Sequence, residues 1–253
     1  MRTDRRVLVV RGSREFLLAP GDTQETDLGI LDLPADATSG TVVETHLGEP
    51  FEVRRLRGPD LFDHLERTGA PMMPRDIGLV IGHTGVASGD RALDAGTGTG
   101  VLAAYLGRLG VEVTTYERDP DFAEVARSNM VTAGVSDLVD VRTGDLTDAL
   151  DDLGDETDDG YDLLTLDTGD APAVVERADD LLAPGGFLAV YSPFVESTRE
   201  CVETARETGL EDIETLETIQ RRMDFDERGS RPSTAGVGHT GYLLFARFRP
   251  TFE

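Results

Sequence analysis

The sequence contains no lysine and a single cysteine, Cys201. All 24 basic residues are therefore arginines, against 49 acidic residues, and the formal net charge is −25. One cysteine excludes an intramolecular disulfide. No apolar run has the length of a membrane span or of a secretory signal, so we expect a cytoplasmic protein with no membrane partner.

The absence of lysine also indicates the solvent in which the chain works. Ordinary acidic proteins still use lysine as one of their commonest residues. In multimolar salt, carboxylates stay hydrated and their mutual repulsion is screened within a few Å. We therefore predict a halophilic host.

The pattern of residues divides the chain into two parts. Residues 6–57 carry short β-forming runs separated by glycine, proline and aspartate, which predicts a small β domain. Two helices are expected next, over 58–69 and 73–86. We place the domain boundary so that residues 1–65 form the N-terminal β domain and residues 66–253 form the second domain.

From Arg91 onward, strand and helix patterns alternate, which predicts a doubly wound parallel α/β sheet. The expected helices cover 99–109, 119–133, 172–183 and 195–208, between strands at 92–95, 111–117, 138–145, 161–167 and 186–192. Two extended stretches, 211–225 and 233–248, follow without a helix between them and predict a terminal antiparallel strand pair. The acid-rich stretch 148–160 reads as a solvated loop, and we expect no metal site there.

A glycine-rich turn in "LDAGTGTG" follows the first of these strands. Its glycines are Gly96, Gly98 and Gly100, and Val101 stands where a dinucleotide fingerprint has its third glycine. The spacing G-x-G-x-G after Asp94 is typical of S-adenosylmethionine enzymes. That cofactor has no pyrophosphate, and a carboxylate near the turn suits the ammonium of its amino acid tail. The turn therefore predicts S-adenosylmethionine as the cofactor.

Four acids stand at the ends of successive strands: Asp94, Glu117, Asp145 and Asp167. Glu117 is placed to accept hydrogen bonds from both ribose hydroxyls, as an acid there does with either cofactor. Asp145 is placed near an adenine amino group. Each acid alone could equally be a capping or loop residue. Four in register favour a ligand site, because ligands of open α/β sheets bind at these ends.

Neighbours of these residues complete the predicted cofactor site. Phe122 either covers the cofactor adenine or belongs to the core. The other neighbours assigned to the cofactor are Thr99, Arg118 and Leu146.

Several segments together resemble one known family. They are "HLG" at 46–48, "MPRDIGLVI" before the first strand, "LDAGTGTG", "YERDPDFAEVARSN", "LLTLD" and the closing "RPSTAGVGHTGYLLFARF". With them the chain resembles, over nearly its whole length, the tRNA (adenine-N1)-methyltransferases that modify the T-loop adenine at tRNA position 58, in their bacterial and archaeal homomeric form. The Pro-basic-Asp helix start and the closing segment are the specific parts, whereas many methyltransferases share the glycine turn.

The resemblance implies a class I, Rossmann-like methyltransferase fold, tRNA as partner and a homotetramer. It implies methylation of N1 at position 58, with position 57 as a second target in some archaeal relatives, and the halophilic composition adds a haloarchaeal host. It also places Asp167 beside the target base. Two departures from the family pattern concern this pocket, since Gly169 and Met73 stand where the family usually has a proline and an aromatic residue.

N1 of adenine already carries a lone pair, so its methylation needs no general base. Asp167 is the predicted catalytic residue, because its carboxylate can bind the exocyclic amino group and favour the positive charge that develops on the ring. The alternative is a structural strand-end acid. We accordingly expect no steep rise of rate with pH near neutrality.

The T-loop adenine is stacked within folded tRNA and must be flipped into the pocket. The residues predicted to hold it or the adjoining backbone are Met73, His83, Arg231, His239 and Tyr242. His239 could instead anchor a hairpin turn. We assign two clusters of arginines to contacts with the rest of the tRNA. The first is at 54, 55 and 57, and the second is at 221 and 222. Both could equally be solvated surface.

Two other functions remain open at this point. The first is a methyltransferase acting on a protein or a small molecule with the same cofactor turn. The second is a non-catalytic tRNA-binding partner subunit. Such a subunit should have lost the glycines or the strand-end acids, and this chain keeps them all.

Overall fold

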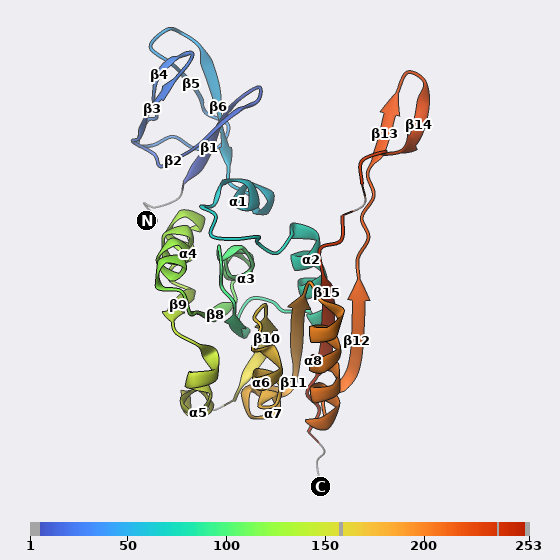
Figure 1. Ribbon diagram of the computed structural model, residues 1–253. Helices are drawn as coiled ribbons and strands as arrows, with labels where there is room; N and C mark the ends of the chain where they lie inside the picture. Colours follow the sequence, from blue (N-terminus) through green and yellow to red (C-terminus); the bar gives the residue numbers. More distant parts are fainter. Residues whose placement is uncertain (1–5, 157–158, 237, 251–253) are drawn as a thin grey trace.

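A computed structural model describes residues 6–156, 159–236 and 238–250. The N-terminal part is a small β structure, drawn in blue in Figure 1. An antiparallel sheet has the order β2-β1-β6-β5, and β3 and β4 form a separate hairpin. These strands are β1 (Val7–Arg11), β2 (Arg14–Leu18), β3 (Thr23–Thr26), β4 (Gly29–Asp32), β5 (Val42–Glu44) and β6 (Pro50–Arg55).

This N-terminal sheet has its own apolar cluster, in which Val9, Leu31, Phe51 and Val53 are almost fully buried. The strands predicted within residues 6–57 are thus present. The domain boundary after residue 65 stays a prediction.

The second sheet has seven strands in the order β12-β15-β11-β10-β7-β8-β9. In this sheet β15 is antiparallel to both of its neighbours, and the other pairs of neighbouring strands are parallel. The strands are β7 (Arg91–Ala95), β8 (Glu112–Glu117), β9 (Val139–Thr143), β10 (Tyr161–Leu166), β11 (Leu182–Ser192), β12 (Glu211–Glu217) and β15 (Tyr242–Arg247). The predicted doubly wound sheet with a terminal antiparallel pair is confirmed, but the pair covers only 211–217 and 242–247 of the two extended stretches that were expected.

Helices cover both faces of this sheet, because its central strands are apolar on both sides. A cluster of buried apolar residues lies on each face of the sheet. Ala92 and Leu93, which are neighbours on β7, belong to different clusters. The first cluster contains residues of α1 (Gly58–His64), α2 (Pro74–Thr84), α3 (Val101–Leu109) and α4 (Pro120–Ala133). The second contains residues of α5 (Leu146–Glu156), α6 (Ala171–Val175), α7 (Ala178–Leu181) and α8 (Val195–Glu207).

The acid-rich stretch 148–160 was wrongly predicted as a loop, since α5 continues through Glu156. Its apolar residues Leu146, Leu150 and Leu153 recur at helical spacing and are all buried in the second cluster. The many acids between them hide this stripe in the sequence. Residues 157–158 of the stretch lie outside the described part.

Several predicted helix boundaries also need correction. The helix predicted over 58–69 ends at His64, because Leu65 has an extended backbone, and the helix predicted over 73–86 ends at Thr84, before the left-handed Gly85. The helix predicted over 99–109 begins only at Val101, because Gly100 before it has a left-handed backbone with φ of +78°. The single helix predicted over 172–183 is two short helices, α6 and α7, and β11 already begins at Leu182.

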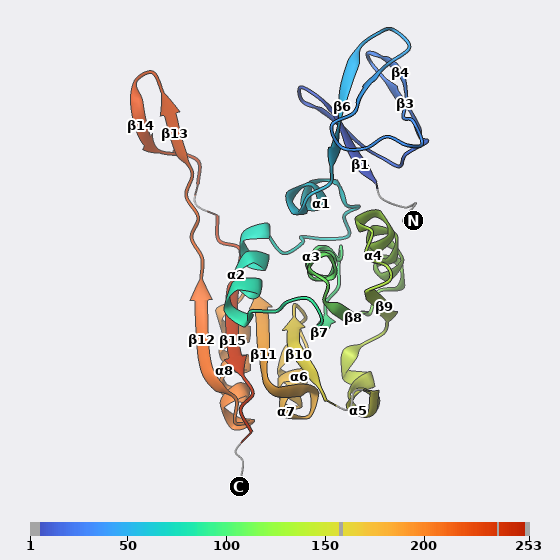
Figure 2. The ribbon, with the colours of Figure 1, turned by 180° about the vertical axis from the view of Figure 1, so that it is seen from behind.

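A hairpin that the sequence did not predict lies between β12 and β15. Its strands, β13 (Met223–Asp226) and β14 (Gly229–Pro232), pair only with each other among the described strands. Both views show this arm projecting past the seven-stranded sheet toward the same end as the N-terminal sheet (Figures 1 and 2). Within the described residues, no helix has the length and apolarity required to cross a membrane.

Candidate active site

The glycine-rich turn connects β7 to α3 through three left-handed residues. The φ angles of Gly96, Gly98 and Gly100 are +90°, +51° and +78°, a region that residues with side chains rarely adopt. A Cβ at position 96 would lie 2.1 Å from the carbonyl oxygen of Asp167, and one at position 100 would lie 2.6 Å from Cε of Met130. A left-handed backbone therefore favours glycine at both positions. At position 96 the backbone of Asp167 also leaves no room for a side chain, whereas the atom near position 100 is the end of the flexible Met130 side chain.

Asp94 joins the three central strands next to this turn. It pairs in register with Thr115 on β8 and with Thr165 on β10, and both hydroxyls donate to its carboxylate at 2.5 Å. Since the Thr115 hydrogen points to Asp94, the hydroxyl of Thr97, 2.5 Å away, donates to Thr115. Burial raises the pKa of Asp94. Each oxygen of Asp94 thus accepts one hydrogen bond and keeps a further acceptor position, and its contact with the cofactor ammonium stays a prediction.

Glu117, at the end of β8, holds the turn against the start of α4. Its Oε2 accepts from the backbone N–H of Gly98 at 2.8 Å, and its Oε1 accepts from that of Asp119 at 3.1 Å. A carboxylate has about four acceptor positions. Each oxygen of Glu117 can therefore accept one further hydrogen bond, which matches the two ribose hydroxyls expected there.

Asp167 follows β10 and lies directly beside the turn. Its backbone N–H donates to the carbonyl of Ala95 at 2.8 Å, and the side chain is half-buried. Burial, and secondarily the charge of Asp94, raises the pKa of Asp167 to about 7. The residue can therefore exchange a proton near neutral pH.

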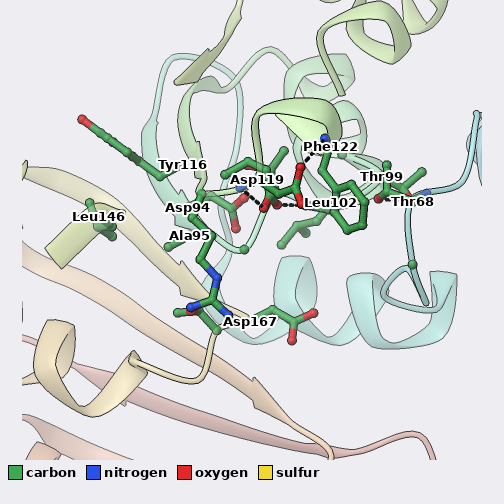
Figure 3. Close-up of a pocket in the computed structure, with 18 of the residues that line it drawn as sticks. Thr68, Asp94, Ala95, Thr99, Leu102, Tyr116, Asp119, Phe122, Leu146 and Asp167 are labelled. Atoms are coloured by element: carbon green, nitrogen blue, oxygen red, sulfur yellow. Dashed lines mark hydrogen bonds between the residues drawn. The ribbon is translucent and has the colours of Figure 1, made fainter. Parts of the chain in front are cut away.

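These residues surround a cleft of about 490 Å³ at the carboxyl ends of the parallel strands. Figure 3 shows Asp94, Phe122, Leu146 and Asp167 around it. The structure brings every residue predicted for the cofactor, and Asp167, to this cleft: Asp94, Gly96, Gly98, Thr99, Gly100, Val101, Glu117, Arg118, Phe122, Asp145, Leu146 and Asp167. What each contributes to a bound ligand stays a prediction.

Three of the predicted side chains have informative contacts. Phe122 is 37% exposed at the cleft, which excludes the alternative of a core residue. The N–H and hydroxyl of Thr147 both donate to Oδ1 of Asp145 and lower its pKa. Nη1 of Arg118 lies 3.4 Å from Oδ2 of Asp170, which also lines the cleft.

The five residues predicted for the substrate are dispersed, and none is among the described residues that line the cleft. Met73 precedes α2 and is partly exposed, next to Met72, which does line the cleft. Arg231 lies on β14 in the projecting arm. His83 stacks on Phe245 at 4.6 Å and gains no support for a substrate role from this position.

His239 and Tyr242 lie together at the start of β15, with ring centroids 5.1 Å apart. His239 also contacts Oε1 of Glu217 at 2.9 Å and the carbonyl of Pro193 at 3.2 Å. These two contacts raise its pKa and attach the returning segment to β12 and to the end of β11. The anchoring interpretation of His239 thus matches its contacts.

The sequence reasoning missed a polar cluster between α2 and this returning segment. Arg75 donates to the Thr240 hydroxyl at 2.7 Å, and the hydroxyl of Tyr191 donates to the Thr240 carbonyl. Tyr191 follows Val190, which pairs in register with Leu166, so the cluster adjoins Asp167; burial and, secondarily, the charge of Asp167 raise the pKa of Tyr191. Oδ1 of the buried Asp76 lies 3.6 Å from Nε of Arg75, and burial raises the pKa of Asp76. The Pro-basic-Asp motif was recognised, but nothing in its pattern gave this contact.

The segment between α1 and α2 was also missed as a wall of the cleft, which residues 68–72 line. Asn129 of α4 binds this segment. A signal existed, because Asn129 interrupts a helix face otherwise formed by Ala123, Ala126 and Met130.

Comparisons with known proteins agree with this architecture. The pattern of the family described as "tRNA methyltransferase complex GCD14 subunit" matches residues 65–229. The tRNA (adenine(57)-N(1)/adenine(58)-N(1))-methyltransferase TrmI of Methanocaldococcus jannaschii is 33% identical, with 95% of this chain and 93% of that protein covered. The tRNA (adenine(58)-N(1))-methyltransferase TrmI of Thermus thermophilus is 30% identical, with 84% and 82% covered.

A solved structure is similar over the whole chain. It is a SAM-dependent O-methyltransferase from Thermotoga maritima, 26% identical, with a TM-score of 0.79 and coverage of 100% of this chain and 96% of that one. The shared architecture is the Rossmann-like fold of class I methyltransferases.

Proposed function

The chain belongs to the tRNA methyltransferase complex GCD14 subunit family, and on this premise we propose that it transfers a methyl group from S-adenosylmethionine to N1 of the adenine at tRNA position 58. Position 57 is a second candidate, because the Methanocaldococcus relative is named for both adenines. One observation carries the proposal: Asp167 lies against the glycine turn in the cleft that collects all the residues predicted for the cofactor.

The residues of the cleft fit this cofactor. Glu117 keeps two free acceptor positions for the ribose hydroxyls, Phe122 offers an aromatic face, and Asp145 can accept from the adenine amino group. The carboxylate of Asp94, next to the glycine turn, would repel a pyrophosphate. When bound, S-adenosylmethionine supplies a methyl group activated by its sulfonium.

Asp167 performs the chemistry expected of this chain. As a carboxylate it accepts a hydrogen bond from the exocyclic amino group of the target adenine, which orients N1. Its negative charge then offsets the positive charge that develops on the ring. Since its pKa is about 7, Asp167 must be ionised before it can do either.

For the tRNA itself, we retain Met73, Arg231, His239 and Tyr242 as contacts outside the cleft. Of the arginine clusters, Arg54 is already paired with Glu52 at 2.7 Å, whereas the exposed arginines at 55, 57 and 222 are better placed to bind phosphates. Individual hydrogen bonds from arginines to phosphates contribute more to tRNA binding than the overall charge of the protein, because counterion release is small in molar salt.

We also propose a homo-oligomer, a tetramer by family resemblance, working in the cytoplasm of a haloarchaeon. The β13–β14 arm supports association, since Met223 and Phe225 on this thin hairpin are 50% and 75% exposed. An isolated two-stranded hairpin is at best marginally stable in water. The absence of lysine and the charge of −25 support the halophilic host.

The test is methylation of unmodified tRNA transcripts at molar KCl, with the product mapped by mass spectrometry. We expect N1-methyladenosine at position 58 with this chain alone, and none there in a transcript carrying guanine at 58; a matching change at 57 tests the second position. The runner-up is methylation of a protein or small molecule, favoured by the likeness to an O-methyltransferase. If the transferred methyl group is found only in protein or metabolite fractions, the chain methylates one of those substrates and the proposal is wrong. If no acceptor is methylated, a non-catalytic subunit is favoured.

A further inference from the structure

We propose that Asn129 is a positioning residue, which holds the segment between α1 and α2 as one wall of the cofactor cleft. This inference rests on the proposed cofactor. Asn129 lies on α4, is 3% exposed, and is not itself among the described residues that line the cleft. Its effect on the cofactor must therefore pass through the groups that it binds.

The side chain of Asn129 uses all of its hydrogen-bonding groups except one acceptor position. Its Nδ2 donates to the carbonyls of Glu66 and Thr99, both at 2.9 Å, and its Oδ1 accepts from the N–H of Glu66 at 3.1 Å. An unbonded amide would be costly on a helix face formed by alanine and methionine. The burial of Asn129 is thus accounted for by the two backbone segments that it joins.

Both segments belong to the cleft or lead into it. Thr99 is part of the glycine-rich turn, and Glu66 begins the stretch of which residues 68–72 line the cleft. A second link reinforces the first, because the N–H of Thr68 donates to the hydroxyl of Thr99 at 3.3 Å. Figure 3 shows Thr68 and Thr99 side by side at the cleft. The wall and the turn are therefore held at a fixed separation from one point on α4.

This arrangement has a consequence for cofactor binding. A segment of irregular structure that must be ordered on binding lowers affinity, because its lost conformational freedom opposes binding. With Asn129 in place the wall is ordered beforehand. Removing the amide should raise the dissociation constant of the cofactor without altering the chemistry at Asp167.

The experiment compares Asn129→Ala and Asn129→Asp with Ser128→Ala, a control at the neighbouring exposed position of α4. In Asn129→Asp the shape is kept, but an oxygen replaces the nitrogen that faces two carbonyls. Calorimetry with S-adenosylhomocysteine at molar KCl should show about tenfold weaker binding or more in both Asn129 variants, and unchanged binding in the control. Hydrogen exchange should rise in residues 66–72.

Kinetics separate positioning from general destabilisation. We expect KM for S-adenosylmethionine to rise, with kcat at saturating cofactor near the wild-type value. Asn129→Ser, whose hydroxyl keeps one donor, is the milder variant if the others do not fold, and it should fall between them and the wild type. A lower Tm with unchanged affinity for S-adenosylhomocysteine would make Asn129 merely structural and overturn the proposal. Failure of the wild type to bind S-adenosylhomocysteine would instead contradict the proposed function.

Discussion

The carboxylate of Asp94 lies close enough to that of Asp167 for its negative charge to raise the pKa of Asp167, which burial raises more strongly, to about 7. The two residues end neighbouring parallel strands, and the threonine hydroxyls bound to Asp94 fix its carboxylate in the buried centre of the sheet. Burial is thus the main cause of the raised pKa of Asp167, and the carboxylate of Asp94, which lines the same cleft, adds to it.

The first prediction concerns pH and revises the flat profile expected from the sequence. N1 of adenine needs no deprotonation, but Asp167 must be charged to accept the amino hydrogen bond. We expect kcat/KM for tRNA to rise with pH through about 7 and to level off above about 8, because this ratio reports the free enzyme. A ratio that is constant between about pH 6 and 8 at molar KCl would contradict this role.

The second prediction concerns the stability of the fold. The folded-state pKa of Asp167 is raised from 3.8 to about 7, so the native state binds the proton more tightly than the unfolded chain, and stability falls as pH rises between these values. The shift corresponds to an upper value of about 4 kcal/mol. Since the amide also carries a burial cost, Asp167→Asn should be more stable than the wild type by about 1 to 3 kcal/mol at pH 8. The gain should be absent near pH 4, and calorimetric unfolding at both pH values checks this.

The third prediction concerns turnover. Asp167→Asn keeps the shape and part of the hydrogen bonding but removes the charge, whereas Asp167→Ala removes both. We expect single-turnover rates to fall by about a hundredfold or more in Asp167→Ala and by less in Asp167→Asn, with cofactor affinity nearly intact. Wild-type rates in Asp167→Ala at saturating tRNA and cofactor would show that the acid is only structural.

The fourth prediction concerns Glu117. Glu117→Ala should weaken S-adenosylmethionine by about 2 to 4 kcal/mol, because two charge-assisted hydrogen bonds to the ribose are lost. The variant should also be less stable, since Glu117 accepts from the N–H groups of Gly98 and Asp119. Glu112→Ala, at the exposed start of the same strand, is the matched control. Calorimetry should also show no NAD binding by the wild type; tight NAD binding would exclude the proposed cofactor.

The fifth prediction concerns salt. At about 0.1 M KCl the Debye length is about 10 Å, and repulsion among the carboxylates is no longer screened. With a net charge of −25, we expect unfolding or subunit dissociation on dialysis from about 2 M to 0.1 M KCl. Circular dichroism and light scattering at both concentrations measure this. Equal stability at the two would mean that the acidic surface has another origin.

The sequence predicted the cofactor side of the cleft better than its substrate side, for a physical reason. Strand ends meet at one edge of a parallel sheet, so Asp94, Glu117, Asp145 and Asp167 come together through topology alone. Met73, His83 and Arg231 lie on different elements, and their positions depend on how α2 and the arm pack. Periodicity does not contain that information.

Two features have a signal in the sequence that the surrounding residues hide. The leucine stripe of α5 is hidden by acids, and the single polar residue on the inner face of α4, Asn129, marks a contact that only the folded chain identifies. We recognised no sequence signal for the division of 172–183 into two short helices. The same holds for the β13–β14 hairpin.

The place of β15 in the sheet bears on how the protein is made. β15 is synthesised after β12 but lies between β12 and β11, so β12 cannot join the sheet while residues 242–247 are still inside the ribosome. The glycine-rich turn and the strand-end acids are complete well before that moment. The segment at Thr240 that receives the hydroxyl of Tyr191 is not. The strand-end acids of the cofactor cleft are therefore synthesised before the segment that completes the surroundings of Asp167, and the seven-stranded sheet cannot close until β15, whose Leu244 and Phe245 are buried, has emerged.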